Sequence, residues 1–93
     1  MLVKEKTFDD RAKDIGLMIG IPNEIYMWTV SKNSTLYMEC INELWYVWRE
    51  TYDENKSVCI SYKNIAQGDD FSIVLTGAKK YINYVKQLRG DQK

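Results

Sequence analysis

Four short runs of β-favouring residues dominate the centre of this 93-residue chain. They are rich in Tyr, Trp, Val, Ile and Thr, and apolar and polar side chains tend to alternate along them. The runs span 25–30, 35–41, 44–50 and 57–62. Three segments with the length and composition of hairpin turns separate them, at 31–34, 42–43 and 53–56. This pattern predicts a four-stranded antiparallel meander.

The three turns predict a consistent register. They place three pairs opposite each other: Met27 with Met38, Met38 with Val47, and Arg49 with Ile60. One face of the sheet is then largely apolar, and we expect it to form the core. That face holds Ile25, Met27, Leu36, Met38, Cys40, Trp45, Val47, Val58, Ile60 and Tyr62.

The second face of the predicted sheet is aromatic, with acidic residues between the rings. It holds Tyr26, Trp28, Tyr37, Glu39, Tyr46, Trp48, Glu50, Cys59, Ser61 and Lys63. Tyr and Trp are frequent hot spots in protein interfaces, and an uncovered patch of such rings marks an interaction site. We therefore predict a protein-binding surface there. The alternative, in which a helix or a second copy of the chain packs on this face, stays open.

One helix is expected before the strands in the sequence, and another is expected after them. Thr7 and Asp10 have the spacing of a capping box, and the first helix is predicted over 7–19 with Gly20 as its stop. Apolar residues at helical spacing predict a second helix over 71–89, with Asp69 or Asp70 as its N-cap. In the alternative, 71–75 forms a fifth strand and the helix begins near Gly77. Both versions give an α+β fold in a single domain, 1–93.

The absence of histidine limits the chemistry of the chain. It removes Ser-His-Asp and Cys-His catalysis and most zinc sites. The five glycines form neither a P-loop nor a dinucleotide-binding motif. We expect no enzyme activity, no cofactor and no metal. Cys40 and Cys59 lie in apolar runs, and we expect buried, reduced thiols, with a disulfide as the alternative.

Charge and hydropathy exclude further classes of protein. The 13 basic and 13 acidic side chains cancel, so the net charge gives no general attraction to a phosphate backbone and disfavours nucleic-acid binding. No apolar run is long enough to span a membrane. Charged residues begin close to the N-terminus, and the first residues lack the apolar core of a signal peptide. We therefore expect a cytoplasmic protein. Asp53 and Glu54, in a predicted turn, add to the acidic groups available to a partner.

The segment Trp45-Tyr-Val-Trp-Arg-Glu50, its turn at 51–56 and the closing helix together resemble a known group. They are similar to the small α+β immunity proteins of bacterial polymorphic-toxin and contact-dependent growth-inhibition systems, over roughly residues 43–89. The resemblance implies a cytoplasmic protein that binds and neutralises a cognate toxin, often a nuclease. The balanced charge of this chain departs from the acidic character that is common among nuclease inhibitors.

These observations predict a stoichiometric inhibitor that occludes a partner protein. The predicted anchors are aromatic and the predicted polar contacts are acidic. The candidate residues are Tyr26, Trp28, Tyr37, Glu39, Tyr46, Trp48, Glu50, Asp53 and Glu54. Two alternatives stay open: a self-associating protein with the aromatic face as a homodimer seam, and a phage-encoded inhibitor of a host defence enzyme.

Overall fold

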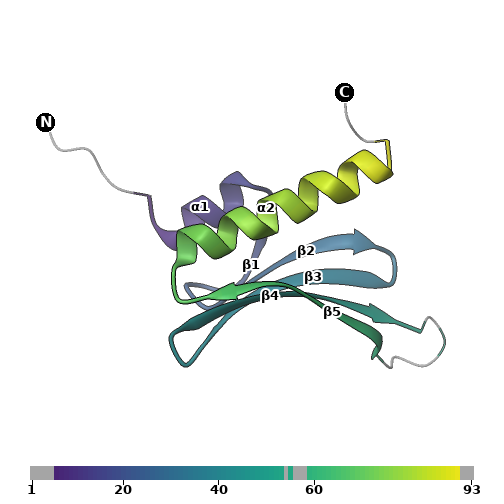
Figure 1. Cartoon of the computed structure of the whole chain (residues 1–93), viewed down its shortest axis with the longest axis horizontal. Helices are drawn as coiled ribbons and strands as arrows, with labels where there is room; N and C mark the ends of the chain where they lie inside the picture. Colours follow the sequence, from purple (N-terminus) through teal and green to yellow (C-terminus); the bar gives the residue numbers. More distant parts are fainter. Residues whose placement is uncertain (1–5, 54, 56–58, 91–93) are drawn as a thin grey trace, which may run out of the picture.

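The fold is an antiparallel sheet of five strands with a helix at each end of the chain, seen in a computed structural model that describes residues 6–53, 55 and 59–90. The elements are α1 (Phe8–Asp14), β1 (Met18–Ile21), β2 (Ile25–Ser31), β3 (Ser34–Ile41), β4 (Leu44–Tyr52), β5 (Cys59–Gly68) and α2 (Phe71–Leu88). The strands follow each other in sequence order across the sheet. Both helices lie on the same side of it, so the molecule has two layers (Figure 1). The α+β class is confirmed.

The long second helix is confirmed, and the fifth strand at 71–75 is wrong. The carboxylate of Asp70 caps α2 by accepting a hydrogen bond from the backbone N–H of Ile73 at 3.1 Å. One face of α2 is buried against the sheet. Its buried side chains, all predicted from the helical spacing, are Phe71, Val74, Leu75, Ala78, Ile82 and Val85. This stripe overrides the weak helix propensity of the β-branched residues in the first turns.

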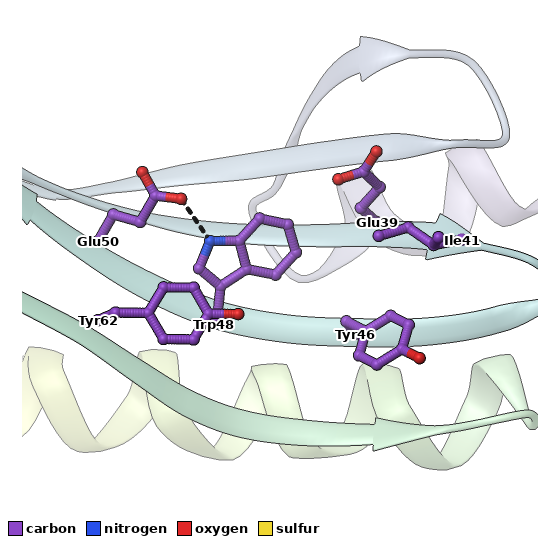
Figure 2. Close-up of a pocket in the computed structure, with 6 residues that line it drawn as sticks. All are labelled: Glu39, Ile41, Tyr46, Trp48, Glu50 and Tyr62. Carbon is purple, nitrogen blue, oxygen red and sulfur yellow. Dashed lines mark hydrogen bonds between the residues drawn. The ribbon is translucent and has the colours of Figure 1, made fainter. Parts of the chain in front are cut away.

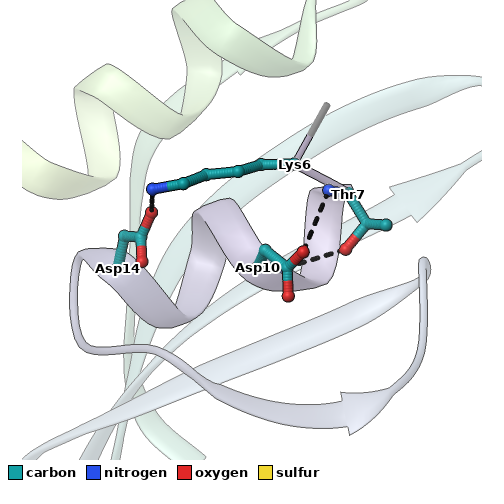
Figure 3. Close-up of polar contacts among 4 residues, drawn as sticks. All are labelled: Lys6, Thr7, Asp10 and Asp14. Carbon is teal, nitrogen blue, oxygen red and sulfur yellow. Dashed lines mark hydrogen bonds and ion pairs between the residues drawn. The ribbon is translucent and has the colours of Figure 1, made fainter. Parts of the chain in front are cut away.

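The first helix is shorter than predicted, although its start is correct. Thr7 and Asp10 form the predicted capping box, and Lys6 pairs with Asp14 at 2.6 Å across the outer face of the helix (Figure 3). The helix ends at Asp14, and Gly16 turns the chain with a φ of 100°. That conformation is available to glycine at little cost.

Residues 18 and 19, predicted as the end of that helix, belong instead to β1 (Met18–Ile21). Ile19 of β1 lies opposite Tyr26 of β2, so the segment gains backbone pairing and burial at the sheet edge. Gly20 lies within β1 and does not cap a helix. The additional strand of the sheet therefore precedes the four predicted strands in sequence. It was not predicted because its apolar residues continue the helical spacing of the first helix.

The central hairpin is confirmed. Cys40 lies opposite Trp45 and Met38 opposite Val47, as the two-residue turn predicts. Asn42 and Glu43 both have positive φ, at 51° and 68°. Two consecutive residues of this kind form the type I′ turn that suits the twist of a two-residue hairpin.

The predicted register between β2 and β3 is wrong by one residue. Met38 lies opposite Tyr26, and Met27 lies opposite Tyr37, because the register shifts between Thr29 and Ser31. A single extra residue in a strand moves every following side chain to the other face. Tyr26 and Trp28 are therefore on the helix side, whereas Ile25 and Met27, predicted as core, are on the opposite face.

The predicted register between β4 and β5 is also wrong. Arg49 lies opposite Lys63 rather than Ile60, and two shifts interrupt the pairing. The strand continues to Gly68, six residues beyond its predicted end. Ile60 and Tyr62, predicted as core, are 63% and 59% exposed. Val58 lies outside the described residues. Ser61 and Lys63 belong to the helix side, where the Lys63 ammonium lies 5.8 Å from the ring centre of Tyr81.

The two thiols are free in the structure, but their predicted burial is wrong in part. Cys40 is half-buried and packs against the core cluster, whereas Cys59, at the start of β5, is exposed. Cys59 is exposed because it is the first residue of β5 and lies opposite Tyr52, on the face of the sheet away from the helices.

Gly77 allows α2 to approach the sheet closely. A Cβ built at this position would lie 2.9 Å from the Cβ of Ala66 on β5. Two carbon atoms at that distance are in steric conflict, and Ala66 has no flexible side chain that can move away.

We therefore expect Gly77→Ala to destabilise the protein. Helix propensity alone would favour alanine by about 1 kcal/mol. Overpacking against Ala66 costs about 1–3 kcal/mol and outweighs that gain. Urea denaturation of both proteins measures the difference, and Thr76→Ala, an exposed change one residue away, is the control. An increase in stability for Gly77→Ala would contradict the close approach.

Tyr26 joins the sheet to α1 through a buried hydroxyl. Its ring is fully buried, and its hydroxyl donates to Oδ1 of Asp9 at 2.6 Å. The backbone N–H of Asn23 donates to the same oxygen at 2.9 Å. These hydrogen bonds, that of Tyr26 first, hold the pKa of Asp9 below its usual value. Burial and the hydrogen bond to Asp9 raise the pKa of Tyr26.

This arrangement predicts a pH-dependent effect of Tyr26→Phe. Ionised Asp9 stabilises the fold above its unfolded pKa of about 3.9, and the contribution is lost as the pH falls through the lower folded pKa. In Tyr26→Phe the pKa of Asp9 returns toward its usual value. We expect the variant to be less stable than wild type at pH 7, with a smaller difference at pH 3. Urea denaturation at both pH values tests this, and an equal difference at both would contradict it.

Candidate functional site

The face of the sheet opposite the helices is not covered by any described element (Figure 1). We call it the open face. Strand alternation and the observed register place side chains from β2, β3, β4 and β5 on it. Its apolar and aromatic members are Ile25, Met27, Tyr37, Ile41, Leu44, Tyr46, Trp48, Tyr52 and Tyr62; its polar members include Glu39, Glu50, Asn64 and Gln67. The open face is therefore aromatic and acidic.

Three rings form a continuous row across the middle of the open face. Tyr37 on β3 and Trp48 on β4 have ring centres 5.4 Å apart and planes inclined by 26°. Trp48 and Tyr62 on β5 have ring centres 6.2 Å apart and planes inclined by 21°. Near-parallel aromatic pairs of this kind stabilise cross-strand packing. The row gives the open face an ordered aromatic surface.

Glu50 holds two of the aromatic side chains in place. The indole Nε1 of Trp48 donates to its Oε2 at 2.7 Å, and the hydroxyl of Tyr52 donates to its Oε1. Both partners lie two residues away on the same strand, where side chains share a face. The hydrogen bond to Glu50, together with partial desolvation, raises the pKa of Tyr52. Glu50 is therefore a positioning residue for the rings.

A hollow of about 310 Å³ lies on the open face beside this network (Figure 2). It is lined by Glu39, Ile41, Tyr46, Trp48, Glu50 and Tyr62. The indole of Trp48 is seen broadside in Figure 2, with Glu50 at one end and Glu39 beyond the other. The hollow thus combines an aromatic floor with carboxylates at two sides.

Glu39 differs from Glu50 in its contacts. It lies opposite Tyr46 in the β3–β4 pairing, and its carboxylate has no hydrogen-bond or ion-pair partner within the described part of the chain. A partly exposed carboxylate beside aromatic rings is available to a charged group from outside the protein.

The charged side chains of the described residues are unevenly distributed, although α1 carries both signs, with Asp9, Asp10 and Asp14 beside Arg11 and Lys13. Helix α2 carries Lys79, Lys80 and Lys86 and no acidic residue. Arg49 and Lys63 of the sheet also turn to the helix side, where both contact Tyr81. The described positions of the open face hold two glutamates and no Lys or Arg. A chain with no net charge is therefore polarised, with an acidic open face.

Of the residues predicted to bind a partner, five lie together on the open face. They are Tyr37, Glu39, Tyr46, Trp48 and Glu50. Asp53 follows β4, where its carboxylate accepts a hydrogen bond from the backbone N–H of Asn55 at 2.8 Å. Glu54 lies outside the described residues.

Two of the predicted binding residues lie on the wrong face. Tyr26 is fully buried beneath α1, so its side chain is inaccessible to a partner. Trp28 is half-buried against the core cluster, with the guanidinium of Arg89 5.3 Å from its ring centre. The one-residue shift near Val30 is the cause of both errors.

Several residues of the open face were not among the candidates. Tyr62, predicted as core, lies on the open face because the β4–β5 register shifts by one residue between Thr51 and Tyr52, which reverses the faces of the β5 residues that follow. Tyr52 lies two residues beyond the run predicted as a strand, 44–50, and belongs to β4. Its spacing of two from Glu50 was the available signal, because residues i and i+2 of a strand share a face.

No family model, curated protein or solved structure matches this chain. Within the described ranges, no group of three or more His, Cys, Asp or Glu side chains is arranged to hold a metal ion. The described helices include none that is long and apolar enough to cross a membrane.

The network around Glu50 predicts a change in the titration of Tyr52. In Glu50→Gln the carboxylate that favours the protonated phenol is absent, so the pKa of Tyr52 is expected to fall toward the usual value of about 10. NMR titration of the tyrosine ring carbons, assigned with Tyr52→Phe, measures it. Tyr84 on α2 is the internal control. An unchanged pKa of Tyr52 would show that the contact with Glu50 is not formed in solution.

Proposed function

We propose that this chain is a stoichiometric inhibitor that binds another protein through the open face. One observation carries the proposal: a sheet face with five aromatic side chains and two carboxylates lies uncovered opposite both helices. Aromatic side chains bury roughly 150–250 Å² each, and typical specific interfaces bury about 800 Å² per partner. Four of the five rings of the open face are already partly buried, so the rings supply anchors and part of the area of an interface of ordinary size.

Binding by occlusion suits the rigid architecture of this face. The rings are held by neighbouring strands and by Glu50, so they lose little conformational freedom when a partner docks. The absence of histidine from the chain also favours binding over acid–base catalysis. The proposed mechanism is a stable complex in which the open face covers a functional surface of the partner.

We further propose that the partner is a cognate bacterial toxin, so that the chain acts as an immunity protein. The resemblance of residues 43–89 to immunity proteins supports this class. The acidic open face adds an electrostatic argument, because it complements the basic surface with which a nuclease binds its phosphate-rich substrate. A toxin with such a surface is the partner class that we favour.

Self-association through the open face is less favourable on electrostatic grounds. A two-fold dimer brings the same patch of each copy together. Glu39 and Glu50 would then face an acidic surface that has no Lys or Arg at its described positions. Like charges brought together in an interface oppose association.

We expect Trp48→Ala to weaken the complex by more than about 1 kcal/mol, because it removes the central ring of the row. Trp48→Ala should lower the free energy of unfolding less than Trp45→Ala does, because Trp45 is buried in the core whereas Trp48 is partly exposed. The tagged chain, with its variants, is used to isolate a partner from the native host, and calorimetry on the purified partner gives the affinity.

Tyr84→Ala is the matched control, since Tyr84 is an exposed aromatic residue on the opposite layer. The immunity step is tested by expressing the captured partner in a sensitive bacterium. Growth should be arrested by the partner alone, restored by the wild-type chain or Tyr84→Ala, and not restored by Trp48→Ala. Equal protection by Trp48→Ala would contradict a role for the open face.

A further inference from the structure

The hollow on the open face has the chemistry of a site for a cationic side chain. Its floor is formed by Tyr46 and Trp48, and aromatic faces attract cations through their quadrupole. Glu39 stands at its side with a carboxylate that has no partner within the described part of the chain. The two features together complement a positive charge that also has a flat or apolar surface.

The polarity of the open face strengthens this inference. The described cations of strands β4 and β5 are turned to the other layer: Arg49 donates to the hydroxyl of Tyr81 at 2.8 Å, and Lys63 lies over the ring of Tyr81. Neither reaches Glu39 as an ion-pair partner. No cation among the described residues pairs with this carboxylate, which leaves it available to a cation from another molecule.

We propose that the hollow binds an arginine side chain of the partner protein, stacked on Trp48 and paired with Glu39; this inference rests on the proposed function. Arginine fits better than lysine for two reasons. Its planar guanidinium stacks on aromatic rings, and it forms two parallel hydrogen bonds with a carboxylate. Ile41 at the rim adds an apolar contact for the methylene groups of the arginine.

Glu50 has a different role from Glu39 in this site. Both of its oxygens already accept hydrogen bonds, from Trp48 and Tyr52. Glu50 and Glu39 are also separated by about four residues along the sheet, roughly 14 Å between backbones. Glu50 therefore keeps the indole in place, and Glu39 supplies the counter-charge that the arginine contacts.

The test uses the full chain and a blocked Gly-Arg-Gly peptide as the probe. Two further peptides serve as comparisons: one with citrulline, which has the shape of arginine without its charge, and one with lysine. The three indole N–H signals of the chain report binding in an NMR titration, with Trp28 and Trp45 as internal controls. We expect the arginine peptide to shift the Trp48 signal with an affinity on the order of millimolar.

The citrulline peptide should bind roughly fivefold more weakly, and Glu39→Gln should reduce the affinity for the arginine peptide by about the same factor. Glu24→Gln, which removes an exposed carboxylate from the β1–β2 turn, should leave the affinity unchanged. Equal binding of the citrulline peptide, tighter binding of the lysine peptide, or no effect of Glu39→Gln would overturn the proposal. So would shifts at Trp28 as large as those at Trp48.

Failure of this inference is distinguishable from failure of the proposed function. If the arginine peptide does not bind but Trp48→Ala abolishes the complex with the captured partner, the open face is a protein interface without an arginine anchor. If the peptide binds as expected and the partner complex is insensitive to Trp48→Ala, the hollow is an arginine site, and the toxin-binding role of the open face is wrong.

Discussion

The packing of α2 on one face of the sheet is the contact on which the rest of the structure depends. Its apolar stripe, from Phe71 to Val85, covers strands β4 and β5, and α1 closes the same layer beside it. The strands then place their fully buried apolar residues, such as Leu36, Met38 and Val47, toward the helices. The side chains on the opposite face are left to solvent or to a partner. One-sided packing therefore creates both the core and the open face.

The open face is organised by contacts within the sheet rather than by a covering layer. Glu50 accepts hydrogen bonds from Trp48 and Tyr52, and the ring of Trp48 lies between those of Tyr37 and Tyr62. These contacts hold large side chains at the surface without burying them. Such preorganisation lowers the entropic cost of binding. The two carboxylates of the open face have different roles. Glu50 accepts hydrogen bonds from side chains of its own strand, whereas Glu39 has no such partner among the described residues.

Elements with a regular spacing of apolar residues or a turn of defined length were predicted correctly, whereas strands with register shifts were not. Apolar residues at helical spacing located α2, and the Asn42-Glu43 turn located the β3–β4 hairpin with its register. Five candidate site residues belong to that hairpin, and all five are on the open face. Tyr26 and Trp28 were misplaced because a shift near Val30 reverses the faces of β2. Nothing local in the sequence marks that irregularity, since both registers place apolar residues in the core.

By itself, the sequence determined the fold class, the central hairpin, the stripe of α2 and the aromatic and acidic character of one sheet face. These depend on side-chain periodicity and on a turn of defined length, both of which are local properties. The tertiary structure decided that residues 18–21 form a strand, that Tyr26 is buried against Asp9, and that Tyr62 joins the open face. These depend on bulges and edge pairing, whose free energies are set by burial against elements distant in sequence.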